Sequence, residues 1–286
     1  MLGTIAFGIF GLAVLVFIAF VFSRKRKAVN LRLVLSGIAL QLAFAFIVIL
    51  VPGGKEFFEA LSSIFVRIIS FSLDGAAFIF GPLAEFETLG FIFAFQVLPT
   101  IIFFASLMGV LYHLGIMQKI VQGMAWVMFK ALRISGAESL SVAANVFVGQ
   151  TEAPLVVRPY ISRMTESELF TMMVGGMATI AGGVLAAYIA MLGGADEAAQ
   201  LFYAKHLLSA SIMAAPATIV IAKILQPETG VSQTAGEVTL HVEKTATNVI
   251  EAAANGAADG WRPVSYTHLT LPTICFKCRA RGGAGE

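Results

Sequence analysis

A polar and acidic segment at residues 145–154 interrupts an otherwise hydrophobic stretch of the chain. It reads Asn-Val-Phe-Val-Gly-Gln-Thr-Glu-Ala-Pro, so the carboxylate of Glu152 stands close to several amide and hydroxyl side chains. A carboxylate inside a membrane segment is costly and marks a functional site by default. Amides and hydroxyls add directional donors and acceptors that can bind the edge of a polar ligand. The segment therefore predicts a binding site within a membrane.

The hydrophobic run that leads into this segment is too short to cross a bilayer. Residues 140–149 make up about half of the ~20 residues that a spanning helix needs. Ser135 and Glu138 form the pattern of a capping box that starts a helix, and Pro154 can open a second short helix after the turn. We therefore expect a re-entrant hairpin over about 136–163 with its polar tip near mid-membrane. Transporters tolerate irregular backbone at that depth where it lines a cavity.

A second segment of small residues follows the expected hairpin. Thr165 and Glu168 make another capping box, which starts a predicted span at 169–192. The middle of this span, 175–183, is rich in glycine and other small residues, and such a centre either packs closely against another helix or unwinds.

Composition places the chain in a membrane. Hydrophobic residues make up 58% of it and charged residues only 13%, which is far from the balance of a soluble domain. Long uninterrupted apolar runs favour helices over an outer-membrane barrel. Two further segments, 55–73 and 116–133, alternate apolar and charged residues at helical spacing, which is typical of helices that lie in the membrane interface. The expected spans are 3–22, 33–51, 90–115, 169–192 and 197–225.

Charge predicts how these spans are oriented. The cluster Arg24–Lys27, together with Arg32, is interpreted as a signal of a cytoplasmic loop in preference to a lipid-binding patch. The N-terminus is then extracytoplasmic. Counting crossings from there places the hairpin on the cytoplasmic side, where Arg158 and Arg163 belong. The net charge of +2 points to no partner.

The end of the chain differs in character from the rest. Residues 264–273 have no helical period and resemble one reading frame of the transposase mosaic-end adapter used in sequencing libraries. We therefore expect residues 261–286 to be non-native, and the natural protein to continue differently beyond Gly260. Cys275 and Cys278 have the spacing of half a zinc site or of a redox pair. No second cysteine pair or histidine at ligand spacing accompanies them, so we assign them no metal.

Several motifs occur in the order and spacing of one known family. They are Gln150-Thr151-Glu152-Ala153-Pro154-Leu155, Arg158-Pro159-Tyr160, Met164-Thr165-Glu166-Ser167-Glu168-Leu169 and Ala178-Thr179-Ile180-Ala181-Gly182. This set resembles the concentrative nucleoside transporters, and the spans from about residue 1 to 260 are similar to the same family. The resemblance implies an all-α integral membrane fold. A re-entrant hairpin and a discontinuous helix form the first half of its inverted repeat.

The resemblance also implies a division of the chain. We expect N-terminal spans and an interfacial helix at 1–89, then the first repeat of the transport core at 90–225. A connector and the start of the next helix would follow at 226–260, and the tail at 261–286. The second repeat is missing from this division, so we expect a C-terminally truncated fragment that is inactive by itself. The residues that contact the sugar are expected in the second hairpin.

By motif position, the family implies two sets of site residues. Contacts to the nucleobase would come from Gln150, Thr151, Glu152 and Val184. Sodium would bind side-chain oxygens of Asn145 and Thr179 and backbone carbonyls of Val148 and Ile180. Structural alternatives stay open: Glu152 could pair with an arginine or cap a helix, and Asn145 and Thr179 could form hydrogen bonds that hold helices together. A proton could replace sodium if burial raised the pKa of Glu152.

The resulting hypothesis is a cation-coupled nucleoside symporter of the inner membrane. The family implies a homotrimer that works by alternating access, with the nucleoside and the lipid bilayer as partners and no nucleic acid. Its alternative is a gate-type membrane protein of similar architecture that acts as a regulator or passive pore. No paired nucleophile and base, no metal cluster and no phosphate-binding glycine loop stands in the sequence, which argues against an enzyme.

Overall fold

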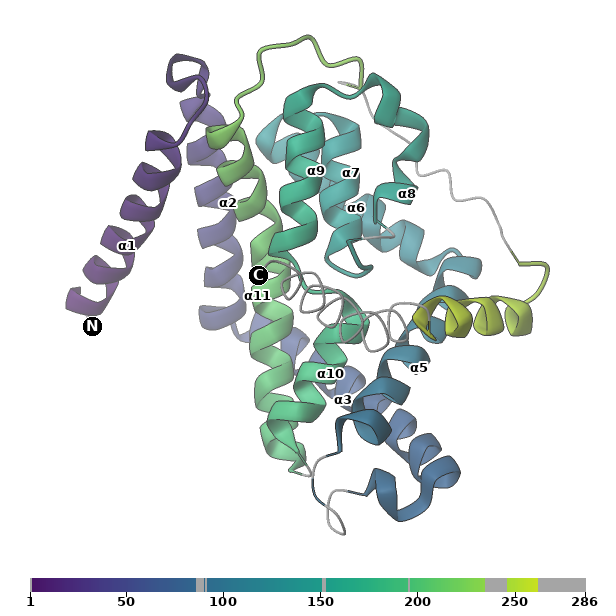
Figure 1. Cartoon of the computed structure of the whole chain (residues 1–286). Coiled ribbons are helices and arrows are strands. Elements are labelled where there is room, and N and C mark those ends of the chain that lie inside the picture. Colours follow the sequence, from purple (N-terminus) through teal and green to yellow (C-terminus); the bar gives the residue numbers. More distant parts are fainter. Residues whose placement is uncertain are drawn as a thin grey trace, which may run out of the picture. The chain divides into compact units, whose positions relative to one another are not determined.

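A computed structural model of the chain describes residues 2–85, 90, 92–150, 153–194, 196–234 and 246–261. These residues form helices joined by short connections, with no strand among them. Three short 3-10 helices lie at Arg26–Ala28, Gly81–Ala84 and Arg158–Arg163, and a final helix covers 249–261. The α-helices shown in Figure 1 are α1 (Leu2–Val21), α2 (Leu31–Leu50), α3 (Pro52–Phe80), α5 (Phe93–His113), α6 (Ile116–Leu132), α7 (Gly136–Asn145), α8 (Ala153–Val156), α9 (Glu166–Ala178), α10 (Gly182–Gly193) and α11 (Glu197–Leu225).

Within the described part of the chain, five helical segments are long and apolar enough to cross a membrane, which confirms the predicted all-α, multi-span fold. They are Leu31–Val48, Gly53–Ala84, Phe93–His113, Glu166–Gly193 and Glu197–Leu225. A shorter apolar helix, Phe7–Val21, corresponds to the predicted N-terminal span. The predictions made for the adapter-like tail, with Cys275 and Cys278, lie outside the described residues.

One predicted interfacial helix is longer than expected. The segment 55–73 belongs to α3, which has 29 residues and the length and composition of a spanning helix. The exposed Asp74 and Gly75 were a plausible end for it. A single glycine inside a helix costs only about 1 kcal/mol, however, and the apolar residues that follow sustain the helix. The segment 55–73 is therefore part of a longer helix than predicted, and its place in the membrane interface stays a prediction. The segment 116–133 forms the separate helix α6.

The chain folds into two compact units, each made of stretches that are distant in sequence. The first unit comprises Met1–Ala60, Gln118–Gly182 and Lys205–Val242. The second comprises Leu61–Met117, Gly183–Ala204 and the described part of Glu243–Glu286. This division groups residues that lie close together in space. The predicted division into 1–89, 90–225 and 226–260 follows the order of the sequence instead and stays a prediction.

In the first unit, α7 is the most enclosed element. All ten of its residues are buried, and it packs against both α8 and α9. Its start and that of α9 are the two predicted capping boxes. The Ser135 hydroxyl accepts from the Glu138 amide at 3.2 Å, and the Thr165 hydroxyl accepts from the Glu168 amide at 3.2 Å. Both carboxylates bond back to the N-cap amides, so the sequence patterns are confirmed.

In the second unit, small residues let two helices approach closely. The Ser106 hydroxyl on α5 donates to the Ala253 carbonyl of helix 249–261 at 2.9 Å. A methyl group at Gly109 would lie 2.6 Å from the Ala252 carbonyl, and one at Gly256 would lie 2.6 Å from the Ala105 carbonyl. Packing through glycine and serine is the usual way for helices to associate in a membrane.

We expect Gly37→Ala to destabilise the first unit, because α2 approaches α11 at this glycine. A methyl group there would lie 2.1 Å from Cγ2 of Val220, a buried β-branched side chain that has little freedom to move. Overpacking of this kind costs roughly 1 to 3 kcal/mol. The apparent melting temperature of the full-length protein in detergent should fall, and Val220→Ala added to the variant should restore part of it. Gly8→Ala, with no atom within 4 Å of the new methyl group, is the control.

Candidate functional site

The polar segment forms a tight reversal of the chain. Helix α7 ends at Asn145, and the amides of Phe147 and Val148 both donate to the Ala144 carbonyl, at 3.0 and 2.9 Å. The Ala153 amide then donates to the Gly149 carbonyl at 3.0 Å, and α8 begins at Ala153. Pro154 in the first turn of α8 needs no hydrogen-bond partner for its nitrogen, so the turn can start a helix at once.

The small-residue segment is interrupted, as one of its two interpretations predicted. Helix α9 ends at Ala178, Thr179 is extended with φ −112° and ψ 158°, and α10 begins at Gly182. The expected span at 169–192 is therefore a discontinuous helix. The interruption takes the carbonyl of Ile180 out of both helical hydrogen-bond series, so this oxygen is available to another partner.

The two irregular points meet each other. The Thr179 hydroxyl lies 3.1 Å from the Asn145 carbonyl and 2.9 Å from the Gly175 carbonyl, and its single proton can serve either oxygen. The Gly182 amide donates to the Phe147 carbonyl at 2.9 Å. Asn145 itself is only 2% exposed. The end of α7 and the break after α9 therefore form one buried junction, which we call the α7–α9 crossing.

Two glycines of α9 make room for the turn. The Asn145 side-chain nitrogen lies 3.4 Å from where a methyl group at Gly175 would stand, and 3.5 Å from one at Gly176. The Cβ atom of Gln150 lies 2.9 Å from that same methyl position at Gly176. Close packing and unwinding, the two interpretations of the glycine-rich segment, thus occur side by side: the glycines pack, and the residues after them unwind.

The crossing offers oxygen atoms without a charge. Amide, hydroxyl and backbone carbonyl oxygens are hard ligands that suit sodium or another hard cation. Among the described residues, no group of three or more histidine, cysteine, aspartate or glutamate side chains could hold a metal ion. Thr179 also makes the contact that its structural alternative predicted, a hydrogen bond between helices. The two roles are compatible, because a hydroxyl that donates its proton still has lone pairs for a cation.

The other predicted residues are placed less completely. Val148 is buried in the turn after α7, and the exposed Gln150 follows it beside Gly176. Thr151 and Glu152 lie outside the described residues. Val184 stands in the first turn of α10, belongs to the second unit and is 38% exposed. The structure thus brings together Asn145, Thr179, Val148 and Gln150 within the first unit.

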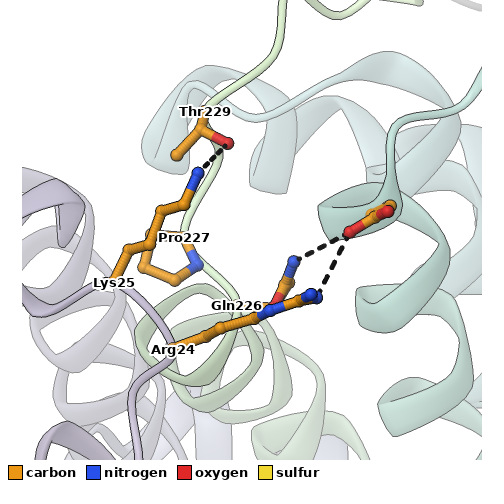
Figure 2. A pocket seen from close by; sticks show the side chains of 6 residues that line it. Arg24, Lys25, Gln226, Pro227 and Thr229 are labelled. Atoms are coloured by element: carbon orange, nitrogen blue, oxygen red, sulfur yellow. Dashed lines mark hydrogen bonds and ion pairs between the residues drawn. The ribbon is translucent and has the colours of Figure 1, made fainter.

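Sequence reasoning missed a polar cluster at the other end of α7 and α9. Lys223, only 6% exposed, forms an ion pair with the fully buried Glu138. At the surface beside it lies a pocket of about 110 Å³, lined by Arg24, Lys25, Glu166, Gln226, Pro227 and Thr229 (Figure 2). The signal in the sequence was a lone lysine near the end of a hydrophobic span, which needs a buried partner.

Comparison with known protein families matches the chain in three consecutive parts. The first corresponds to the N-terminal part of sodium-dependent nucleoside transporters at residues 10–83. The second is a gate domain described as nucleoside recognition at 94–195, and the third is the C-terminal part of the same transporters at 206–271. The second match contains the whole α7–α9 crossing.

Individual proteins are similar over most of the chain. A nucleoside permease, NupC, of Helicobacter pylori is 41% identical over 259 residues, which are 89% of this chain and 59% of the permease. An uncharacterized transporter of Haemophilus influenzae is 47% identical over 88% of this chain and 58% of its own length. Sodium/nucleoside cotransporter 2 of Rattus norvegicus is 39% identical over 87% of this chain and 36% of the cotransporter.

Solved structures agree with these matches. CNTnw in an inward-facing substrate-bound state is similar with a TM-score of 0.81 and 42% identity, over 96% of this chain and 63% of that one. An outward-facing variant of CNTnw gives 0.81 and 43% identity, over 93% of this chain and 62% of that one. The chain therefore spans about three fifths of the bacterial relatives and solved structures that it matches.

We expect Gly176→Ala to separate the hairpin turn from α9. The new methyl group would lie 2.9 Å from Cβ of Gln150, which cannot rotate away, so the turn must shift. A shift that weakens the Thr179–Asn145 hydrogen bond by ~1.4 kcal/mol should speed local amide exchange about tenfold. The rate of amide exchange in the turn is measured by hydrogen–deuterium exchange of peptides covering 146–150 in the full-length protein.

Gly123→Ala is the matched control, because this exposed glycine of α6 has no atom within 4 Å of a new methyl group. It should leave exchange at 146–150 unchanged. Equal exchange in both variants would show that the turn does not depend on the close approach at Gly176.

Proposed function

Because the chain belongs to the family of sodium-dependent nucleoside transporters, we propose that the complete protein is a sodium-coupled nucleoside symporter. The observation that carries this proposal is the Thr179 hydroxyl on the Asn145 carbonyl, at the point where a hairpin turn meets a broken helix. Transporters build substrate and ion sites from such interruptions near mid-membrane.

We assign sodium to the α7–α9 crossing. Its ligands are the side-chain oxygens of Asn145 and Thr179 and the carbonyls of Val148 and Ile180. Support comes from the burial of Asn145, from the 3.1 Å contact that joins α7 to the break, and from the loss of helical pairing at Ile180. Sodium on these uncharged oxygens would bind weakly enough to be released after each transport cycle.

The nucleobase is assigned to the tip of the hairpin. Gln150, Thr151 and Glu152 supply donors and acceptors for its edge, and Val184 supplies an apolar contact. The exposed Gln150, held over Gly176, supports a binding surface at this tip. A buried polar partner left unpaired costs about 1 to 3 kcal/mol, so a base with the wrong pattern of donors and acceptors is rejected by that amount.

Coupling follows from the short distance along the chain between the two sets of residues. Gln150 follows Asn145 by five positions. Sodium bound at the crossing restrains the turn, so a nucleoside arriving afterwards meets an ordered tip and loses less entropy. Such linkage is reciprocal, and the nucleoside must raise the sodium affinity by the same factor. Alternating access then carries both together, in keeping with the inward-facing and outward-facing states of the similar solved structures.

The setting of this activity is a bacterial-type inner membrane. We propose a multi-pass homotrimer with an extracytoplasmic N-terminus and a cytoplasmic loop at Arg24–Lys27, and no role as an enzyme. The five apolar helices support insertion in a bilayer. Proton coupling is the alternative to sodium and would use Glu152 as the titrating group. Uptake that follows a proton gradient and does not respond to a sodium gradient would favour proton coupling.

The second candidate function is a gate-type protein that regulates or passively conducts. The match of residues 94–195 to a gate domain described as nucleoside recognition is the observation that favours it. A passive pore equilibrates nucleosides without concentrating them. Accumulation of labelled uridine or adenosine above the external concentration, driven by a sodium gradient into proteoliposomes, separates the two functions.

We expect Thr179→Ala to raise the sodium concentration that gives half-maximal uptake by about tenfold. The reason is the loss of one oxygen ligand, worth roughly 1.4 kcal/mol. Thr179→Ser keeps the hydroxyl and should stay close to the wild type. Thr100→Ala, which removes a buried hydroxyl bonded to the Gln96 carbonyl in the second unit, controls for loss of a helical threonine. An equal sodium response in all four proteins would remove Thr179 from the sodium site.

We expect Glu152→Gln to weaken nucleoside binding. An amide of the same size replaces an acceptor with a donor, so the apparent KM for uridine or adenosine should rise on the order of tenfold at saturating sodium. Glu56→Gln, at an exposed glutamate of α3, is the control. If uptake by Glu152→Gln keeps its KM but loses a dependence on the proton gradient, Glu152 carries the coupling ion instead of the substrate.

A further inference from the structure

Lys223 is a buried cation that the proposed sites do not use. It stands near the end of α11, and its ammonium group lies against side chains from three other segments of the first unit. It forms an ion pair with Glu138 on α7, donates to the Ser167 hydroxyl on α9 at 2.9 Å, and lies 3.3 Å from Glu228 after α11. An ammonium group has three N–H donors, so these three partners account for all of them.

A second carboxylate ties the same ends together. Glu168, fully buried in the first turn of α9, accepts hydrogen bonds from the hydroxyls of Ser232 and Thr234, the latter at 2.7 Å. The Thr234 carbonyl in turn accepts from the Gly136 amide, the first residue of α7, at 3.0 Å. The chain after α11 is therefore bonded to the starts of both α7 and α9.

The surface pocket of Figure 2 is the outer edge of this arrangement. Arg24 lies 3.3 Å from Glu166, and the Gln226 side chain donates to the same carboxylate at 3.4 Å. Side chains of this ion pair are 69% and 81% exposed, so it adds little stability. The ion pair joins the loop after α1 to the start of α9, and the Gln226 hydrogen bond joins the end of α11 to the same carboxylate.

The geometry links this cluster to the crossing. Helices α7 and α9 are packed side by side (Figure 1), and both begin at the cluster and end at the crossing. Asn145 follows Glu138 by seven positions, which is about 10 Å at the rise of an α-helix. A hydrogen-bonded helix moves along its axis as a unit. Any slip of α7 at Glu138 therefore displaces the Asn145 carbonyl relative to Thr179.

We propose that Lys223 is a positioning residue that fixes the axial position of α7 against α9 and α11, and thereby sets the sodium affinity of the crossing. The effect on sodium affinity rests on the proposed function, whereas the positioning of α7 does not. Stability alone does not explain a buried charge cluster, because apolar residues of similar volume are often as stabilising as a buried ion pair. A directional pairing, in contrast, permits one register of the helices.

The test compares two variants of the full-length protein with a matched control. Lys223→Met leaves Glu138 buried without its partner, and the double variant Glu138→Gln with Lys223→Met removes both charges, which protects folding. Lys205→Met is the control. It lies on the same helix, α11, and removes a lysine that is 2.9 Å from Glu59, but at a partly exposed site.

Two measurements are made on each protein. The first is hydrogen–deuterium exchange of peptides covering 142–148, which needs no transport activity. The second is the sodium concentration for half-maximal uridine uptake, separated from the maximal rate at saturating sodium. A loss of folded protein lowers the maximal rate and leaves the half-saturation concentration unchanged, so the two effects are distinguishable.

In the double variant we expect faster exchange at 142–148 and a half-saturation concentration raised about tenfold, equivalent to ~1.4 kcal/mol. Lys205→Met should match the wild type in both. Exchange that quickens only near residues 135–139, or a wild-type pattern throughout, would overturn the positioning role. If the wild-type protein shows no response to sodium, the proposed function fails, and exchange at 142–148 still decides whether Lys223 positions α7.

Discussion

Every backbone amide and carbonyl inside a membrane needs a partner within the protein, and this requirement bears on the point in the first unit where two helices end. Helices α7 and α9 both end there, so each exposes polar groups that its own helical bonds no longer satisfy. The two ends serve each other: the Thr179 hydroxyl reaches the Asn145 carbonyl, and the Gly182 amide reaches the Phe147 carbonyl. The hairpin and the broken helix are therefore one structural unit, and a site made of their remaining oxygens comes with the arrangement.

Close approach is the condition for this mutual pairing. Without a hydrophobic force between helices in lipid, packing depends on small residues that let backbones come near. A methyl group at Gly176 would lie too close to Gln150, and one at Gly37 would lie too close to the buried Val220 of α11. Burial of all ten residues of α7 follows, because this helix is surrounded within the first unit. The short helix α7 contributes almost no surface to solvent or lipid, and the crossing forms at its buried C-terminal end.

Local chemistry made part of this predictable from sequence. The capping boxes at Ser135 and Thr165 were visible because serine or threonine with glutamate three residues later has a specific structural meaning. The turn after α7 was predictable because a polar segment interrupts a hydrophobic stretch, whereas Glu152 lies outside the described residues. The length of α3 was not predictable from sequence, because Asp74 and Gly75 are compatible with either the end of a helix or its continuation. The pairing of Lys223 with Glu138 was not either, since Glu138 already had a local role in its capping box, and only folding brings α11 to it.

The placement of charge in the first unit separates anchoring from binding. Glu138 and Glu168 stand in the first turns of α7 and α9, where the helix dipole favours a negative charge and where Lys223 and several hydroxyls complete the pairing. The described part of the crossing, at the other ends of these helices, holds neutral oxygens. A carboxylate fixed at that point would hold a cation strongly in every conformation, whereas transport requires binding favourable enough to enter and weak enough to leave. The described charged groups of α7 and α9 therefore lie at one end of the two helices, and the neutral oxygens of the crossing lie at the other.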